Sequence, residues 1–196
     1  MRSLPGLFLA TCFAVAASAA PPPADFHRGV YALHAWQLAR HDTRVEEKSG
    51  QYEGSAAAGY RYRESTHIDT ATGRRLSRIV RDADRPDAIH SAEVNVYDDA
   101  GRLVRSYISI ALPWAPQLPV RTWINLHHYH GELHSYRQFD LSGAVSYEFC
   151  EGKLDGSRVK LSLDGSDIGP AVTRLPAYRA CFDGLRNDWQ AYVNPH

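Results

Sequence analysis

The strongest constraint on the fold of this chain is a series of short segments in which apolar and polar residues alternate. In the first segment, Tyr60 and Tyr62 face one side while Arg61 and Arg63 face the other. This period of two is typical of a half-buried strand. Seven further segments have strand character: 76–81, 88–97, 102–112, 121–129, 133–139, 144–150 and 158–163. We therefore predict a sheet of about eight strands.

Turn sequences separate these segments at short intervals. Asp98-Asp99-Ala100-Gly101 is a strong hairpin signal, and Gly131, Gly143 and Gly156 mark further turns. Short turns join neighbouring antiparallel strands. The segments therefore predict an antiparallel β-meander that curls into a barrel or half-barrel.

The regions on either side of the alternating segments are less regular. Residues 26–47 fit either a helix or a strand, and the weak helical stripe consists of Phe26, Val30, Leu33 and Gln37. Residues 48–58 are rich in Gly, Ser and Ala and predict a loop. Near the other end, apolar residues recur at the spacing of an amphipathic helix: Tyr178, Cys181, Phe182, Leu185, Trp189 and Tyr192. The predicted fold class is β-rich α+β, with the meander closed by this C-terminal helix.

Length and composition fit one globular domain, which we place at residues 26–196. The chain has 196 residues, 44% of them hydrophobic, which is enough for one core. Its 22 basic side chains are balanced by 22 acidic ones, whereas binding of nucleic acid requires a net basic face. No segment approaches the roughly 20 apolar residues that a membrane span needs. We expect neither a nucleic-acid partner nor a transmembrane span.

Residues 1–19 have the features of a secretory signal peptide. Arg2 supplies the positive charge of the n-region, and residues 7–17 form a short apolar h-region. Ala17-Ser18-Ala19 predicts cleavage after Ala19. Residues 20–25 then form a proline-rich leader. A lipoprotein signal that acylates Cys12 is the alternative, and we disfavour it because Thr11 is bulkier than the residue usual at that position. We expect a periplasmic or secreted protein.

Removal of the signal peptide leaves two cysteines, Cys150 and Cys181. An even number of cysteines in an exported protein favours a disulfide bond. No Cys-x-x-Cys motif is present that would indicate a redox site. We predict that this disulfide ties a strand to the C-terminal helix.

The densest group of candidate site residues is the histidine-rich segment 127–134. His128 and His130 share one side of a strand, and we expect His134 on the returning strand to lie opposite His128. Glu132 is a further ligand or an orienting group. Three imidazoles with an open coordination position suit Zn²⁺ or Cu²⁺.

Two other interpretations of this segment need no metal. The histidines form a solvated or partly packed ladder beside the rings of Trp123, Tyr129 and Tyr136, or one imidazole is catalytic. The motifs of hydrolase elbows, phosphate loops and dinucleotide sites are absent. A hydrolase with an unrecognised site is therefore the last alternative, and no catalytic residue is assigned.

The order of the elements is similar to that of lipocalin-type barrels and of periplasmic half-barrels that carry lipid or lipoprotein. The Gly-x-Trp pattern near the first lipocalin strand is absent, with Gly29-Val30-Tyr31 as the nearest match. No family is assigned on this resemblance.

The function we expect is that of an exported, non-catalytic binding or accessory protein. Its concave face would hold an apolar or amphipathic ligand, or its rim would engage a periplasmic partner protein. The candidate lining residues are aromatic: Tyr60, Tyr62, Trp114, Trp123 and Tyr136. Trp114 lies in the proline-rich loop 112–119, which predicts a lid or a partner-binding loop.

Overall fold

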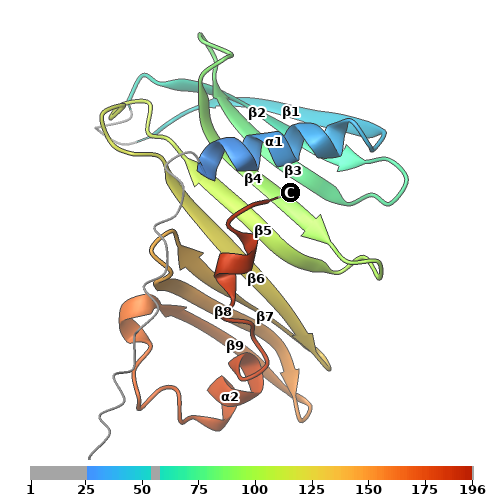
Figure 1. Ribbon diagram of the computed structural model, residues 1–196, viewed down its shortest axis with the longest axis vertical. Coiled ribbons are helices and arrows are strands. Elements are labelled where there is room, and N and C mark those ends of the chain that lie inside the picture. The colour runs from blue at the N-terminus through green and yellow to red at the C-terminus, as the bar shows by residue number, and fades with distance from the viewer. Residues whose placement is uncertain (1–25, 54–57, 196) are drawn as a thin grey trace, which may run out of the picture.

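The computed structural model describes residues 26–53 and 58–195. The predicted signal peptide, leader and Cys12 lie outside the described residues. The described part consists of nine strands, two α-helices and two short 3-10 helices (Figure 1). In chain order they are α1 (Phe26–Leu38), β1 (Thr43–Gln51), β2 (Arg61–Asp69), β3 (Arg75–Asp82), β4 (Ile89–Tyr97), β5 (Leu103–Ile110), β6 (Arg121–His130), β7 (Leu133–Asp140), β8 (Val145–Leu154), β9 (Ser157–Asp164), η1 (Gly165–Asp167), α2 (Pro176–Phe182) and η2 (Trp189–Tyr192).

All nine strands form one antiparallel sheet in which each strand pairs with the next along the chain. The predicted antiparallel meander is confirmed, and each of the eight predicted segments contributes a strand. The sheet is open, because β1 pairs with β2 alone and β9 with β8 alone. The described residues therefore form no closed barrel, and that part of the prediction is not confirmed.

The ambiguous N-terminal segment contains both kinds of element. Helix α1 ends at Leu38, and strand β1 begins at Thr43. The four buried residues of α1 are those of the predicted stripe, Phe26, Val30, Leu33 and Gln37. The loop predicted from residue 48 is wrong for residues 48–51, which belong to β1. This strand is exposed on nearly its whole length, so burial gives it no alternating signature in the sequence.

The helices cover one face of the sheet (Figure 1). Helix α1 packs against β3, β4 and β5, η2 against β6, and α2 against β7 and β8. Val30 and Leu33 of α1 join Ile79, Tyr107 and Ile124 in the main hydrophobic core. A second core beneath α2 contains Leu133, Cys150, Tyr178, Cys181, Phe182 and Leu185.

The predicted C-terminal helix is shorter than its apolar stripe. Helix α2 ends at Phe182, and the chain turns before η2 begins at Trp189. Asp183, Gly184, Asn187 and Asp188 lie between the two helices. These are poor helix formers, so the packing of Leu185 and Trp189 on the sheet decides the path of the backbone.

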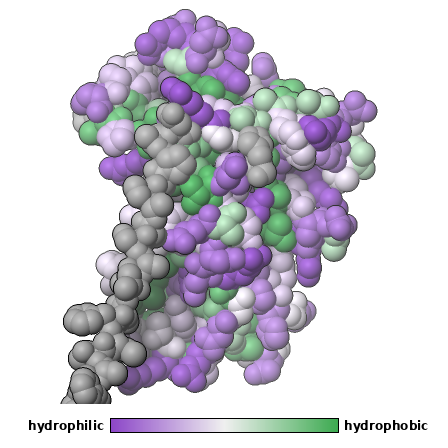
Figure 2. All heavy atoms as spheres, in the orientation of Figure 1, coloured by the Kyte–Doolittle hydropathy of each residue, from purple (hydrophilic) through white to green (hydrophobic). Residues whose placement is uncertain are grey.

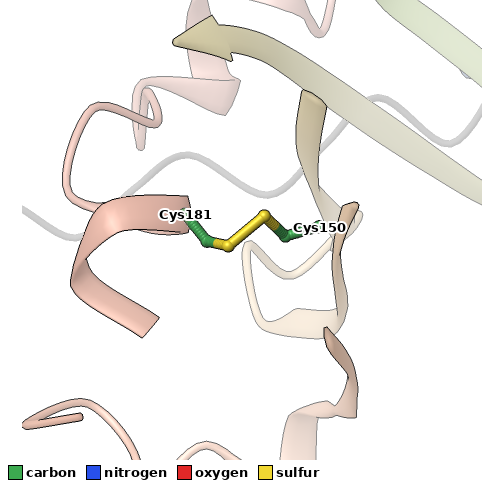
Figure 3. The surroundings of a disulfide bond; sticks show 2 residues. All are labelled: Cys150 and Cys181. Carbon is green, nitrogen blue, oxygen red and sulfur yellow. A yellow bond between two sulfur atoms is a disulfide. The ribbon is translucent and has the colours of Figure 1, made fainter. Parts of the chain in front are cut away.

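Cys150 of β8 and Cys181 of α2 form a disulfide with a Cα–Cα distance of 5.9 Å (Figure 3). The predicted bond between a strand and the C-terminal helix is thus confirmed. Both cysteines are buried in the second core.

No described helix is long and apolar enough to cross a membrane. In the view of Figure 2, hydrophilic side chains dominate and hydrophobic residues form small, separate areas.

Candidate functional site

The face of the sheet opposite the helices carries the candidate site. Paired residues of an antiparallel sheet project to the same face. Tyr107, Ile124 and Phe139 form one paired row on the helix-covered face. His127 is three residues beyond Ile124 on β6 and pairs with Tyr136 of β7. Because side chains alternate along a strand, this pair projects to the opposite face, away from α1, α2 and η2.

Six rings from β6, β7 and β8 form a continuous surface there, which we call the aromatic face: His127, Tyr129, His134, Tyr136, Tyr147 and Phe149. Tyr136 is central, with ring centroids 5.2 Å from His127, 5.9 Å from Tyr147 and 5.5 Å from Phe149. All six rings are half-buried. The surface is therefore partly apolar and remains accessible to a ligand.

The His134 ring lies between two other rings of the aromatic face. It stacks on Tyr129 at a centroid distance of 4.7 Å and on His127 at 5.3 Å. Arg102 lies over the outer ring, with its Cζ 5.9 Å from the Tyr129 centroid. The three rings form one stack, and a guanidinium stands at one end of it.

A row of hydrogen-bonded polar side chains supports the aromatic face. Asn125 donates to the Ser106 hydroxyl at 3.0 Å, and Gln138 donates to Asn125 Oδ1 at 3.0 Å. Ser146 donates to Gln138 Oε1 at 2.9 Å. These bonds cross β5, β6, β7 and β8. They fix the side-chain conformations beside the rings, so the aromatic face is preorganised.

The two histidines of the aromatic face are held as neutral imidazoles. His127 Nδ1 lies 3.1 Å from His134 Nε2, and His127 Nε2 lies 3.3 Å from the Ser106 hydroxyl. Burial, assisted by the neighbouring His134, lowers the pKa of His127 to about 3. Burial also lowers the pKa of His134. Near neutral pH the pair therefore acts as hydrogen-bonding aromatic rings.

We expect the stability of the protein to fall as the pH drops from about 7 to about 5. In that range an unfolded histidine takes up a proton, whereas His127 stays neutral because its folded-state pKa is about 3. His34, whose pKa burial lowers to about 4, adds to the effect. Each such group contributes at most about 1.4 kcal/mol per pH unit. Urea unfolding at several pH values measures this slope.

The variant His127→Gln tests the assignment of this slope. Glutamine keeps a hydrogen-bonding group beside Ser106 but has no proton to exchange in this range. The slope of the unfolding free energy against pH should become shallower, by an amount that corresponds to the uptake of up to one proton on unfolding. A slope equal to that of the wild type would show that His127 is not responsible.

A cleft of about 620 Å³ adjoins the His134 end of the aromatic face. Its walls include His134, Glu151, Lys153, Arg158 and Lys160. His134 pairs with Glu151, and Glu151 pairs with Lys160, so this row continues the aromatic face onto β9. The arrangement places a charged recess beside a surface of stacked rings.

The strand register separates the three histidines of the predicted metal site. Gly131 and Glu132 form a two-residue turn, so His130 pairs with Leu133, His128 with Ser135, and Tyr129 with His134. His134 therefore projects to the aromatic face, opposite in direction to His128 and His130. The expected position of His134 across from His128 is wrong. Within residues 26–53 and 58–195, no group of three or more His, Cys, Asp or Glu side chains is arranged to hold a metal ion.

The five aromatic candidates divide into two groups. Tyr136 belongs to the aromatic face, and Trp123 projects to the same face, two residues before Asn125 on β6. Tyr62 and Trp114 instead lie beside Tyr52, with ring centroids 5.0 Å and 5.2 Å from it, and the Tyr60 ring lies 6.1 Å from Trp114. The proline-rich loop thus packs against this second group.

Neither His127 nor the two rings of β8, Tyr147 and Phe149, is among the site residues expected from the sequence. The signal that would have found His127 is the parity of the β6–β7 turn. A two-residue turn pairs odd-numbered residues of β6 with even-numbered residues of β7, which joins His127 to Tyr136.

The chain was also compared with known proteins. No family model, no curated protein and no solved structure matches it.

Proposed function

We propose that this protein is an exported, non-catalytic binding protein and that the aromatic face and the adjoining cleft take up an amphipathic ligand. The observation that carries the proposal is the preorganised set of six half-buried rings on the sheet face opposite the helices. Partly buried aromatic surface with a few converging polar groups is the usual composition of a ligand site.

The two parts of the site suit the two parts of such a ligand. A flat or apolar body would lie over Tyr136 and the His134 stack, where ring-on-ring contacts add to apolar burial. A polar or charged head would reach the cleft beside Arg158 and Lys160. The disulfide is consistent with an oxidising compartment such as the periplasm.

We expect Tyr136→Ala to lower ligand occupancy about tenfold, because the change removes the ring that contacts three others. The measurement is native mass spectrometry, without chelators, of the protein isolated from the compartment to which it is exported. The control is Tyr97→Ala, which removes a half-buried tyrosine of β4 that hydrogen-bonds to the Arg75 carbonyl.

The spectrum distinguishes this proposal from its alternatives. An organic adduct present in the wild type and in Tyr97→Ala, but lost in Tyr136→Ala, supports the aromatic face. An adduct that all three proteins retain places the ligand elsewhere. A stoichiometric metal mass would favour the alternative of Zn²⁺ or Cu²⁺ binding, and a bare protein mass would favour a partner protein.

A further inference from the structure

Strand β1 forms one edge of the sheet (Figure 1). Among the described residues only β2 pairs with it, and no backbone hydrogen bond joins its other side to another described segment. Most of the strand is exposed, including the Val45 side chain at 47%. An open edge is a template for another strand, and proteins usually protect it with charged side chains. In β1 the order of these charges complements itself.

The hydrogen bonds to β2 determine which backbone groups of β1 face the open edge. The Tyr52 N–H donates to the Tyr60 carbonyl at 3.0 Å. At the other end of β1, the Thr70 N–H donates to the Asp42 carbonyl at 2.9 Å, and the register between these bonds contains no bulge. Because such pairs alternate along an antiparallel ladder, the even-numbered residues of β1 hydrogen-bond to β2. The odd-numbered residues therefore direct their N–H and C=O groups to the open edge.

Symmetry limits how a second copy of the chain can pair with this edge. Two identical antiparallel strands that lie side by side are related by a two-fold axis perpendicular to the sheet, so the residue on the axis lies opposite itself. The charged residues of β1 are excluded from this position, because like charges opposite each other are destabilising: Arg44, Glu46, Glu47 and Lys48. In the interior of the strand, Val45, Ser49 and Gly50 remain.

Of these three positions, only Val45 brings opposite charges together. With the axis at Val45, Arg44 lies opposite Glu46 of the second copy. Asp42 then lies opposite Lys48 of the second copy, and the axis repeats both pairs. All four residues are even-numbered, so these are the non-hydrogen-bonded pairs, in which side chains of neighbouring strands lie closest. The odd-numbered residues supply the backbone hydrogen bonds between the two copies.

The single chain leaves these charges exposed. Arg44 forms an ion pair with Glu46 of its own strand, and both side chains are more than half exposed. An isolated surface pair of this kind contributes little to stability. Opposite a second copy, the two arginines and two glutamates would alternate in one network, and the exposed Val45 side chains would contact each other.

We propose that two copies of this chain associate through β1, with the two-fold axis at Val45, to form one continuous antiparallel sheet. The perpendicular axis keeps the helices of both copies on the same face. This association goes beyond the proposed function and does not depend on it, because the aromatic face belongs to β6, β7 and β8. A pair of short strands is a small interface, so we expect a dissociation constant on the order of 10–100 µM.

The experiment is sedimentation velocity of the exported chain at concentrations from about 1 to about 300 µM, which span the expected dissociation constant. Arg44→Glu and Glu46→Arg, each alone, should weaken the dimer about tenfold or more, because two attractive pairs become repulsive. An equimolar mixture of the two variants should recover association to within about threefold of the wild type, because each pair again joins opposite charges. The double variant Arg44→Glu/Glu46→Arg should recover it in the same way.

Val45→Pro tests the backbone hydrogen bonds. Proline removes an N–H that faces the open edge, so the chain should still fold while the dimer is lost. Urea unfolding verifies that the variant is folded. The control is Arg121→Glu, which reverses the charge of an exposed arginine on β6 and should leave the dissociation constant within about twofold of the wild type.

A chain that stays monomeric up to the highest concentration overturns the proposal. A dimer that both single charge variants retain at wild-type affinity also overturns it, and would place the interface elsewhere, as at the open edge of β9. If the single variants weaken the dimer but their mixture does not recover it, the axis is not at Val45. Ligand occupancy of the aromatic face is measured separately, so either proposal can fail without the other.

Discussion

Replacing Arg137 with methionine is expected to lower the free energy of unfolding by about 3–5 kcal/mol, because it leaves the Glu148 carboxylate buried without its counter-ion. Arg137 is 9% exposed and Glu148 is fully buried. Arg137 Nε donates to Glu148 Oε1 at 2.5 Å, and another guanidinium nitrogen donates to Asn187. Urea unfolding at neutral pH measures the loss.

The surroundings of this ion pair explain why the loss is large. The pair lies on the helix-covered face between β7 and β8, beside Tyr178 of α2. Burial and the neighbouring Glu148 carboxylate raise the pKa of Tyr178 to about 12, so this phenol does not release its proton near neutral pH. No solvent reaches Glu148 to compensate for the missing guanidinium.

The double variant Arg137→Met/Glu148→Leu is the control for this prediction. Removing both charges replaces the ion pair with apolar groups of similar volume, so stability should return to within about 2 kcal/mol of the wild type. A double variant as unstable as Arg137→Met alone would contradict the explanation. In that case lost packing, and not an uncompensated charge, would account for the effect.

Removing the disulfide is expected to lower the free energy of unfolding by about 4 kcal/mol, because Cys150 and Cys181 close a loop of 31 residues in the unfolded chain. The variant Cys150→Ala/Cys181→Ala also removes two buried side chains from the second core. Urea unfolding of the oxidised wild type and of the variant gives the difference.

Reducing agent provides the matched control for this second prediction. Reduction should destabilise the wild type by nearly the same amount and should leave the double alanine variant unchanged. If reduction has no effect on the wild type, the bond does not constrain the unfolded chain as proposed. The packing of Tyr178 and Phe182 on β7 and β8 would then hold α2 in place without the bond.

Much of the fold could be predicted because its signals are local. The strands between residues 60 and 164 have strand character in the sequence and end at turn sequences or at the proline-rich loop, so the meander is encoded in neighbouring residues. The stripe of α1 likewise identifies its four buried side chains. The disulfide was predictable because only one pairing remains once Cys12 is assigned to the predicted signal peptide.

The candidate site was less predictable because it depends on register. His128 and His134 lie close together along the chain, yet the two-residue turn at Gly131 and Glu132 sends them to opposite faces. A shift of one residue would reverse this result. The C-terminal stripe was misleading for a related reason. Its apolar residues are all used in packing, but they come from two short helices and, for Leu185, from the turn between them.

The sequence by itself determined the strands β2 to β9, their order and the pairing of Cys150 with Cys181. Only the tertiary structure decided which face of the sheet the helices cover. Alternation supplies two usable faces, with Ile124 and Leu126 on one and His127 and Tyr129 on the other. Burial of the α1 stripe against Ile79 and Tyr107 takes the more apolar face into the core. The rings and histidines of the other face are left at the surface, where the candidate site forms.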